Sequence, residues 1–310
     1  MKQVLTRIAA AAALSACALG AHAGVVAMAD LDVSQLLIQN SVTGNFLTTA
    51  DLTILPGGSR LSSSSAGLNA TNVFNNSISP TATGTADALS SCVGNCAGAA
   101  SLYTTMQNDT TTHISMPTAG LTYALGDSEI SGSALSGGAA GFTRADVMIA
   151  GSSNVGQANG NVQNSVSAQT LFAVNTSVQA NFFGLYSAYV RTYISPDLLG
   201  SNASATAGNT FSLSVIDTTT GALVLTWIPT AWNGEGSTNS ATGGVAFTQS
   251  SAPGAFATSG SVTLNGGDTY LMTVTQNSTS NAFVIPEPTS LALVGLALAG
   301  AGLVARRRKA

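Results

Sequence analysis

Apolar and polar residues alternate along the second half of the chain, which is the pattern of β-strands that bury one face. Phe211, Leu213 and Val215 are separated by serines, so the three apolar side chains share one face of an extended strand. Turn-forming residues at 217–221 and 265–268 predict two hairpins. Runs of strand length rich in aliphatic, aromatic or β-branched residues occur at 171–174, 182–186, 188–194, 211–215, 222–228, 261–264 and 269–274. This spacing predicts a mainly β fold: an antiparallel β-sandwich or jelly-roll-like body.

The first half of the chain is less regular. Short strands are expected at 35–39, 52–55 and 120–125. The polar tract Ser62–Ser65 and the segment 131–141 are interpreted as long polar loops around them. A further polar stretch, 151–168, either separates two subdomains or forms one long loop within a single sandwich.

Charged residues are scarce and unevenly placed. They make up 7% of the chain, against about 25% in an ordinary soluble protein. Lys2 and Arg7 lie near the start and four basic residues lie at 306–309, so only Arg60, Arg144 and Arg191 remain between them. The body therefore has no basic patch for nucleic acid. Its Ser, Thr, Asn, Gly and Ala suit either a disordered coat or a β-rich exported domain, and the recurring apolar runs favour the domain.

The first 23 residues have the pattern of a signal peptide. A basic start is followed by an alanine-rich apolar stretch, and Ala21 and Ala23 provide the small residues that signal peptidase requires. Export through the Sec translocon and cleavage after Ala23 are expected, which leaves an exported body at 24–283. An alternative stays open, because 14–17 resemble the lipobox in which Cys17 would become a lipidated first residue.

The C-terminal segment has three parts: Pro286-Glu287-Pro288, an apolar stretch, and the basic cluster Arg306, Arg307, Arg308 and Lys309. The stretch 291–305 would reach roughly 22 Å as a helix, and residues 289 and 290 with snorkelling arginines bring it near the roughly 30 Å of a hydrocarbon core. We therefore predict a transmembrane helix at 290–305. The positive-inside rule keeps the basic cluster in the cytoplasm and places the body outside. The prolines hold the segment before the helix extended.

Residues 284–310 resemble the PEP-CTERM sorting signal of Gram-negative bacteria, which combines a Pro-Glu-Pro motif, a hydrophobic helix and a basic end. The resemblance implies recognition by an exosortase, a membrane-bound cysteine protease-like enzyme. It also implies removal of the tail and delivery to the cell surface, commonly beside exopolysaccharide genes. Ile285 stands where the family usually has valine. The resemblance covers the tail alone and carries no direct information about the body.

Cys92 and Cys96 are the cysteines that remain after signal cleavage. Their separation by three residues, including Gly94, and export to an oxidising compartment favour a local disulfide. A metal or redox site is the alternative, although the mature chain has only His113 as a further nitrogen ligand. Neither a metal nor another cofactor is expected. His113 itself is interpreted as a surface or strand residue.

Candidate catalytic residues are few. A glycosidase needs only two carboxylates, so this class stays open. Asp127 and Glu129 would share a face in a strand, but a solvated turn after Gly126 is favoured. Asp30 and Asp32 lack the glycine and the distal glutamate of an EF-hand calcium loop, so they are interpreted as part of an exposed N-terminal segment. Four aromatic residues could stack on sugars or pack in a core: Tyr186, Tyr189, Trp227 and Trp232.

The leading hypothesis is an exported, non-enzymatic protein of the cell surface or matrix, processed by an exosortase and associated with exopolysaccharide or biofilm. The alternative is a secreted carbohydrate-binding or polysaccharide-active domain that uses carboxylates and tryptophans. A stably anchored inner-membrane protein is a third possibility.

Overall fold

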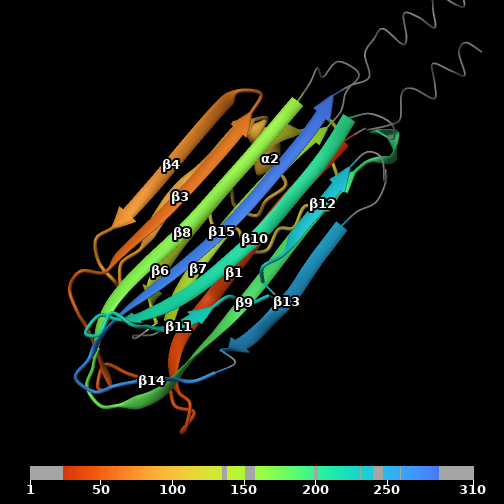
Figure 1. The fold of residues 1–310 in the computed structure, drawn as a ribbon. Coiled ribbons are helices and arrows are strands. Elements are labelled where there is room, and N and C mark those ends of the chain that lie inside the picture. The colour runs from red at the N-terminus through yellow and green to blue at the C-terminus, as the bar shows by residue number, and fades with distance from the viewer. Residues whose placement is uncertain are drawn as a thin grey trace, which may run out of the picture.

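The computed structural model describes residues 24–134, 138–150, 158–198, 202–230, 232–239, 247–258 and 260–285. Within these ranges the chain forms two antiparallel sheets that pack face to face, with long strands running side by side across each layer (Figure 1). The prediction of a mainly β sandwich is confirmed. The signal peptide 1–23, with Cys17, Ala21 and Ala23, and the tail 286–310 lie outside the described residues. No helix in the described part of the chain is long and apolar enough to cross a membrane.

Sheet A has seven strands within the described residues, and its main path runs in the order β13-β9-β1-β7-β6-β5, with β14 paired to β9. Its central strand β1 (Gly24–Asn40) pairs with β7 on one side and with β9 on the other. The remaining strands are β5 (Ala86–Gly94), β6 (Thr122–Ser133), β7 (Gly138–Ala150), β9 (Val178–Ile194), β13 (Phe247–Ala257) and β14 (Val262–Leu264).

Sheet B has eight strands among the described residues, ordered β11-β10-β15-β8-β3-β4, with β12 paired to β10 and β2 paired to β8. Three long strands form its centre: β8 (Ala158–Val174), β10 (Asn202–Asp217) and β15 (Thr269–Ile285). The others are β2 (Leu52–Ile54), β3 (Ser59–Leu68), β4 (Thr71–Ser79), β11 (Leu223–Trp227) and β12 (Glu235–Asn239). Helices are confined, in the described ranges, to α2 (Cys96–Ala100) and the 3-10 helix η1 (Pro196–Leu198).

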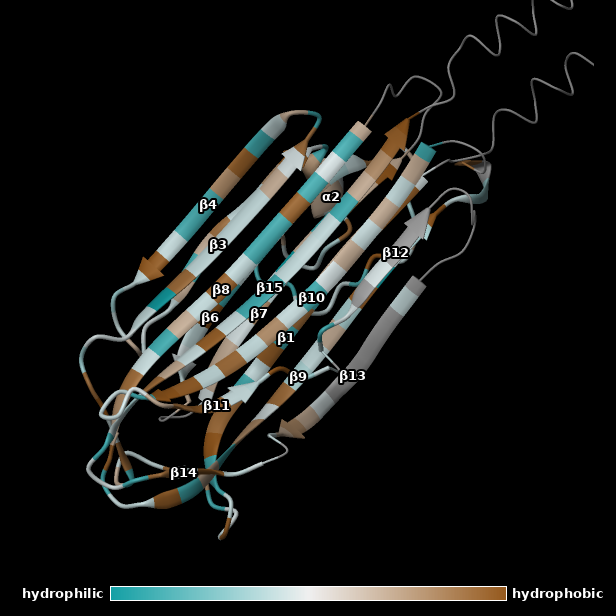
Figure 2. Ribbon diagram, viewed as in Figure 1, coloured by the Kyte–Doolittle hydropathy of each residue, from teal (hydrophilic) through white to brown (hydrophobic). Residues whose placement is uncertain are grey.

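The interface between the sheets differs from one end to the other. At one end large side chains such as Phe172, Phe211 and Trp232 fill the space. At the other end the core consists mostly of alanine and valine, with Ala29 of sheet A and Ala205 of sheet B both fully or almost fully buried. Many alanines of the chain therefore lie at this end of the core. Along single strands, hydrophobic and hydrophilic residues alternate in bands (Figure 2), because successive side chains point to opposite faces of a sheet.

Short polar side chains of sheet B also point into the interface and donate hydrogen bonds to backbone carbonyls of sheet A. Ser280 Oγ lies 2.9 Å from the oxygen of Ala145, and Asn209 Nδ2 lies 2.6 Å from the oxygen of Asp30. Ser62 Oγ donates to the oxygen of Ser128 at 2.6 Å. The tract Ser62–Ser65, interpreted from sequence as a loop, therefore lies in β3. Its inward serines are buried because each has a hydrogen-bond partner across the interface.

One of the two predicted hairpins is confirmed and the other is wrong. The turn at 217–221 joins β10 to β11, which pair antiparallel with one register shift between Val215 and Ile216. The runs on either side of 265–268 instead belong to different sheets, since β14 pairs with β9 and β15 pairs with β10 and β8. Both edges of β15 are occupied over most of its length, so β14 has no place beside it. Both segments contain turn-forming residues between runs of strand length, and the long-range pairing decided which of them joins two paired strands.

The polar stretch 151–168 is mostly strand. Residues from 158 onward form the first part of β8, in the middle of sheet B, while 151–157 lie outside the described ranges. Val162 and Val166 point inward and polar residues alternate with them on the outer side. The outward polar residues make the composition of this segment resemble that of a loop, which is why the strand was not predicted. The segment 131–141, likewise expected as a loop, contributes residues 131–133 to β6 and 138–141 to β7.

Candidate functional site

The outer face of sheet A carries the densest group of ionisable residues in the described part of the chain. Strand register aligns Asp127 of β6, Arg144 of β7, Asp30 of β1 and Tyr189 of β9 in one row across the sheet. Asp146 lies on the same face of β7, two residues from Arg144, because side chains two positions apart in a strand point the same way. Adjacent strands are about 4.8 Å apart, so two carboxylates flank one guanidinium.

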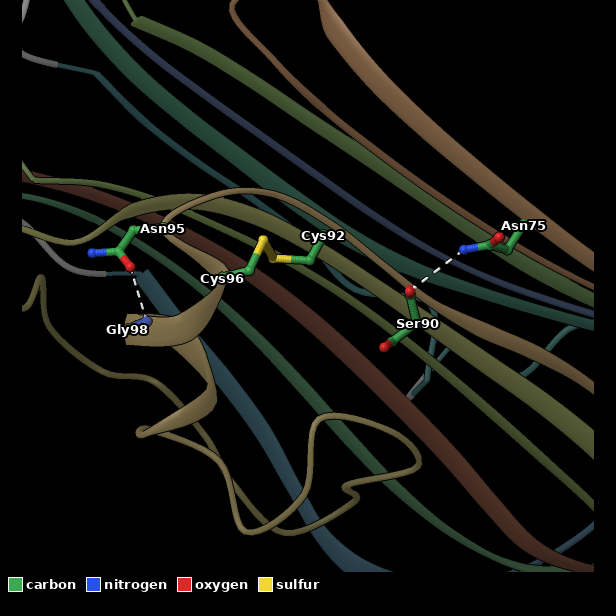
Figure 3. Close-up of a disulfide and its surroundings, with 6 residues drawn as sticks. All are labelled: Asn75, Ser90, Cys92, Asn95, Cys96 and Gly98. Atoms are coloured by element: carbon green, nitrogen blue, oxygen red, sulfur yellow. Dashed lines mark hydrogen bonds between the residues drawn. A yellow bond between two sulfur atoms is a disulfide. The ribbon is translucent and has the colours of Figure 1, made fainter.

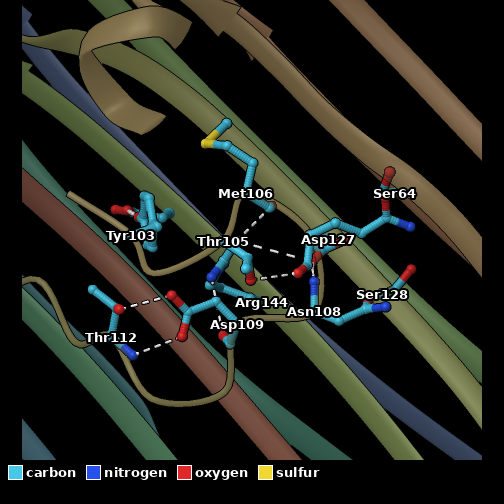
Figure 4. A network of polar contacts seen from close by, with 12 residues as sticks. Ser64, Tyr103, Thr105, Met106, Asn108, Asp109, Thr112, Asp127, Ser128 and Arg144 are labelled. Atoms are coloured by element: carbon cyan, nitrogen blue, oxygen red, sulfur yellow. Dashed lines mark hydrogen bonds and ion pairs between the residues drawn. The ribbon is translucent and has the colours of Figure 1, made fainter. Parts of the chain in front are cut away.

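Arg144 is fully buried and is the centre of this cluster (Figure 4). Its Nη2 lies 3.9 Å from Asp127 Oδ2. The guanidinium also donates to two backbone oxygens of the segment that covers the sheet, from Nη1 to Asp109 at 3.0 Å and from Nη2 to Met106 at 3.0 Å. Its Cζ is 4.3 Å from the centre of the Tyr103 ring. Arg144 thus attaches the covering segment to the sheet beneath it.

The carboxylates are held by hydroxyl and amide groups from the covering segment and from β6. Asp146 accepts hydrogen bonds from the phenols of Tyr123, at 2.7 Å, and Tyr103. Asp127 accepts one from the backbone N–H of Asn108. Asp109, in the covering segment, accepts hydrogen bonds from the backbone N–H of Thr112 at 3.0 Å and from its hydroxyl at 2.7 Å. The cluster is enclosed between sheet and cover, where these hydrogen bonds leave Asp30 Oδ2, Asp127 Oδ1 and Asp146 Oδ1 buried without a hydrogen-bond partner among the described residues.

Burial dominates the electrostatics of these acids. It raises the pKa of Asp30 and Asp146 well above the ordinary value for aspartate, with Arg144 partly opposing the shift at Asp30. Burial also raises the pKa of Asp127 to about 6, against the opposing charge of Arg144. At Asp109 burial acts in the same direction, but the hydrogen bonds from Thr112 and Thr111 outweigh it and lower the pKa. Near neutral pH the raised pKa values make proton uptake by the cluster easier than in the unfolded chain.

Two interpretations from sequence are wrong here. Asp127 does not lie in a solvated turn: it is a fully buried residue within β6, two residues before Glu129. Asp30 is not part of an exposed segment, because β1 is the central strand of sheet A and Asp30 is 3% exposed. The physical reason in both cases is the cover, which buries a face that the local sequence marks as polar. His113 is exposed, as expected, and stacks on Tyr189 with 4.1 Å between ring centres.

The cover consists of α2 and the irregular segment 101–121. The predicted disulfide between Cys92 and Cys96 joins the end of β5 to the first residue of α2, with 6.0 Å between the two Cα atoms (Figure 3). The side chain of Asn95 caps α2 by accepting the N–H of Gly98 at 2.9 Å. A second attachment comes from apolar residues of the cover that pack on the outer face of sheet A: Ala99, Tyr103, Ile114 and Leu121.

A shallow pocket of about 210 Å³ opens beside the cluster. Asp32 and Glu129 lie on its rim with Ser34, Asn108 and Thr110. Register places Asp32, Phe142 and Glu129 in one row, so the two acids are two strand spacings apart, roughly 10 Å between Cα atoms. Burial raises the pKa of Asp32 to about 6 and also raises that of Glu129. The sequence motif paired Glu129 with Asp127, whereas the pocket pairs it with Asp32.

The four aromatic residues proposed for sugar stacking have different surroundings. Trp232 is 2% exposed and packs between Tyr186, at 4.4 Å between ring centres, and Phe256, at 4.3 Å. Trp227 stacks on Phe256 at 4.8 Å, and Tyr189 is buried under His113. Trp232 is therefore a core residue, which is the second of the two roles considered for it from sequence. Groups of three or more His, Cys, Asp or Glu arranged to hold a metal ion are not found among the described residues.

The C-terminal motif begins where the sandwich ends. Val284 and Ile285 are the last residues of β15 and pair with Ala203 and Asn202 of β10. Pro286, Glu287, Pro288 and the basic residues 306–309 follow, outside the described ranges. Comparison with known proteins found no curated protein and no solved structure that matches the chain. The family model described as the PEP-CTERM protein-sorting motif matches residues 284–309. The chain is therefore a protein that carries a PEP-CTERM sorting motif.

Proposed function

We propose that this chain is an exported protein of the cell surface or extracellular matrix that an exosortase processes near Pro286–Pro288. Its work there is non-enzymatic and linked to exopolysaccharide or biofilm. The Sec translocon and signal peptidase are its partners during export, and the membrane holds the tail only until processing. The single observation that carries the proposal is the PEP-CTERM match at 284–309, which marks the chain as an exosortase-targeted exported protein.

The distribution of charge supports this topology independently of the motif. Basic residues gather at 2–7 and at 306–309, and each group favours the cytoplasmic side of a membrane. The 24–283 body between them then lies outside. The bonding of Asp127, Arg144 and Asp146 within their own cluster supports a structural role for the most prominent ionisable groups.

Mass spectrometry of the mature protein from its native host tests the proposal. The expected C-terminal peptide ends near Pro286–Pro288, and the expected first residue is Gly24. A variant with alanine at Pro286, Glu287 and Pro288 should keep its tail, whereas the control Pro80→Ala, at an exposed position, should be processed normally. A mature wild-type chain that extends through Arg306 would refute the proposal. If the mature chain begins at an acylated Cys17, the N-terminus is processed as that of a lipoprotein and not cleaved after Ala23.

A second candidate is a polysaccharide-active enzyme, and the observation that favours it is the pocket shared by Asp32 and Glu129. Two carboxyl groups on opposite sides of a bound sugar are the usual requirement for glycoside hydrolysis. The test is release of reducing ends from the host's own exopolysaccharide, compared among the wild type, Asp32→Asn and Glu129→Gln. Activity lost in both variants and kept in the control Asp51→Asn, a partly exposed residue outside the pocket lining, would establish it. A wild type without activity on this substrate would exclude hydrolysis of that polymer.

A further inference from the structure

The outer face of sheet B has a regular composition along its three central strands. The outward positions of β8 between 159 and 169, of β15 between 273 and 281, and of β10 between 204 and 214 are all Ser, Thr, Asn, Gln or Gly. Strands β8, β15 and β10 lie side by side (Figure 1). They pair in continuous register, so these side chains form rows across the three strands. Successive rows are about 6.7 Å apart along a strand, and neighbouring side chains within a row are about 4.8 Å apart.

Lateral hydrogen bonds order part of this array. Asn277 Nδ2 donates to Thr210 Oγ1 at 3.0 Å, and Asn281 Nδ2 donates to Thr206 Oγ1 at 3.4 Å. An amide has two N–H donors and a carbonyl acceptor, and a hydroxyl both donates and accepts. These contacts therefore fix the side chains and leave further donor and acceptor positions directed outward. The array is ordered before any ligand binds, which lowers the entropic cost of binding.

A hollow of about 390 Å³ opens within the array between β10 and β15. Thr206, Thr210, Thr279 and Asn281 line it, with Asn233 and Gly234 at its edge. Gly208 of β10 lies between Thr206 and Thr210 in this lining and adds no side chain to it. The volume is in the range of small-ligand sites, and the lining residues are all uncharged: threonine, asparagine and glycine with one alanine, Ala207.

We propose that this face, the polar array of β8, β15 and β10, binds a neutral polysaccharide with the hollow as its central subsite. A hydroxyl-rich, uncharged polymer offers repeated donors and acceptors to a repeated, uncharged array, and many weak contacts add up along the chain. Nucleic acid or anionic lipid would need cations, which the outward positions of this array do not supply. A protein partner would need large apolar or aromatic anchors, which the array also lacks. The proposal names the partner class for the surface role proposed above and rests on it.

Co-sedimentation of the purified full chain with cellulose, curdlan and starch, and with the anionic polymer alginate, tests this site. We expect binding to at least one neutral glucan, no binding to alginate, and the same affinity in high salt because the contacts are uncharged. The double variant Thr210→Val and Thr279→Val removes two hydroxyls and keeps β-branched side chains, and should weaken binding by about fivefold or more. The matched control Thr71→Val and Thr263→Val, at exposed positions outside the array, should bind like the wild type.

Absence of binding to all three neutral glucans, or equal binding by both double variants, would overturn the proposal. Self-association that only the Thr210 and Thr279 variant abolishes would assign the face to a second copy of the chain and also overturn it. Circular dichroism of both variants establishes that each is folded. The assay does not depend on processing of the tail, so a negative result here leaves the mass-spectrometric test of exosortase processing unaffected.

Discussion

The two outer faces of the sandwich differ in the charge and in the solvent exposure of their polar side chains. Sheet A concentrates charge: Asp30, Asp127, Arg144 and Asp146 lie on its outer face and are buried by a covering segment. The outward positions of the central strands of sheet B, within 159–169 of β8, 204–214 of β10 and 273–281 of β15, are Ser, Thr, Asn, Gln or Gly, and most of these residues are partly or fully exposed. Two antiparallel sheets therefore have different outer faces. The face of sheet A is covered, and its stability depends on the ionisation of buried acids. The array on sheet B is exposed to solvent and carries no ionisable side chain.

The difference shows that charge content and surface exposure are separate quantities in this protein. The few charges of the body are disproportionately internal, where they attach the cover to sheet A. On the exposed face of sheet B, hydroxyl and amide groups rather than charged groups interact with water. The following changes test that contrast, starting with the largest expected effect.

Replacement of Arg144 by methionine should have the largest effect. Removal of one partner from a buried ionic cluster leaves the others uncompensated, and we expect a loss of about 3–5 kcal/mol in the free energy of unfolding. Denaturant unfolding followed by tryptophan fluorescence measures it. The control is Arg191→Met on the same face, where the half-buried guanidinium donates to the Ser115 oxygen at 2.7 Å, and about 1 kcal/mol is expected. Similar losses in the two variants would contradict an enclosed cluster at Arg144.

The pH dependence of stability should follow from the raised acids. A carboxyl whose pKa is higher in the folded state binds protons more readily there, so stability falls as pH rises from the unfolded value, near 4, through the folded value of about 6 for Asp127 and Asp32. For fully buried Asp127 a shift of this size corresponds to at most about 3 kcal/mol. Asp109 acts in reverse: its lowered pKa contributes stability above pH 4 that is lost in stronger acid.

Stability should therefore be greatest near pH 4–5 and lower at pH 7.5. Unfolding curves at several pH values measure this, and Asp127→Asn should flatten the slope between about pH 4 and pH 6. A wild type that becomes steadily more stable up to pH 7.5 would show that the acids are not enclosed as described.

Changes on the outer face of sheet B should have the smallest effect. Asn277→Thr removes a partly exposed side chain and its hydrogen bond to Thr210, and the expected change is within about 0.5 kcal/mol at any pH. Its neighbour Ser278 points inward and donates to the Thr143 oxygen at 3.0 Å. Ser278→Val should therefore cost about 1–3 kcal/mol, because it leaves buried acceptors without a partner. Equal effects at these adjacent positions would contradict the assignment of the two sides of β15.

Local sequence patterns predicted those features that depend on neighbours along the chain. The alternation at 211–215, the turn at 217–221 and the disulfide between Cys92 and Cys96 are all confirmed, because each is decided within a few residues. The failures, and the choice left open at Trp232, concern residues whose surroundings come from distant segments. Asp127 and Trp232 lie under or among parts of the chain far from them in sequence, so their own neighbours give no sign of burial.

The sequence by itself determined the strand composition of the body and the sorting motif at 284–309, because alternation and a contiguous motif are both properties of the chain read in order. The tertiary structure alone decided which polar residues are buried. Serine, asparagine and aspartate look alike in sequence whether a carbonyl of the opposite sheet, a covering loop or water provides their hydrogen bonds. Ser280 meets the first, Asp127 the second, and Asn161 lies exposed in the open array of sheet B. The difference depends on contacts across more than a hundred residues for Ser280, which no local pattern records.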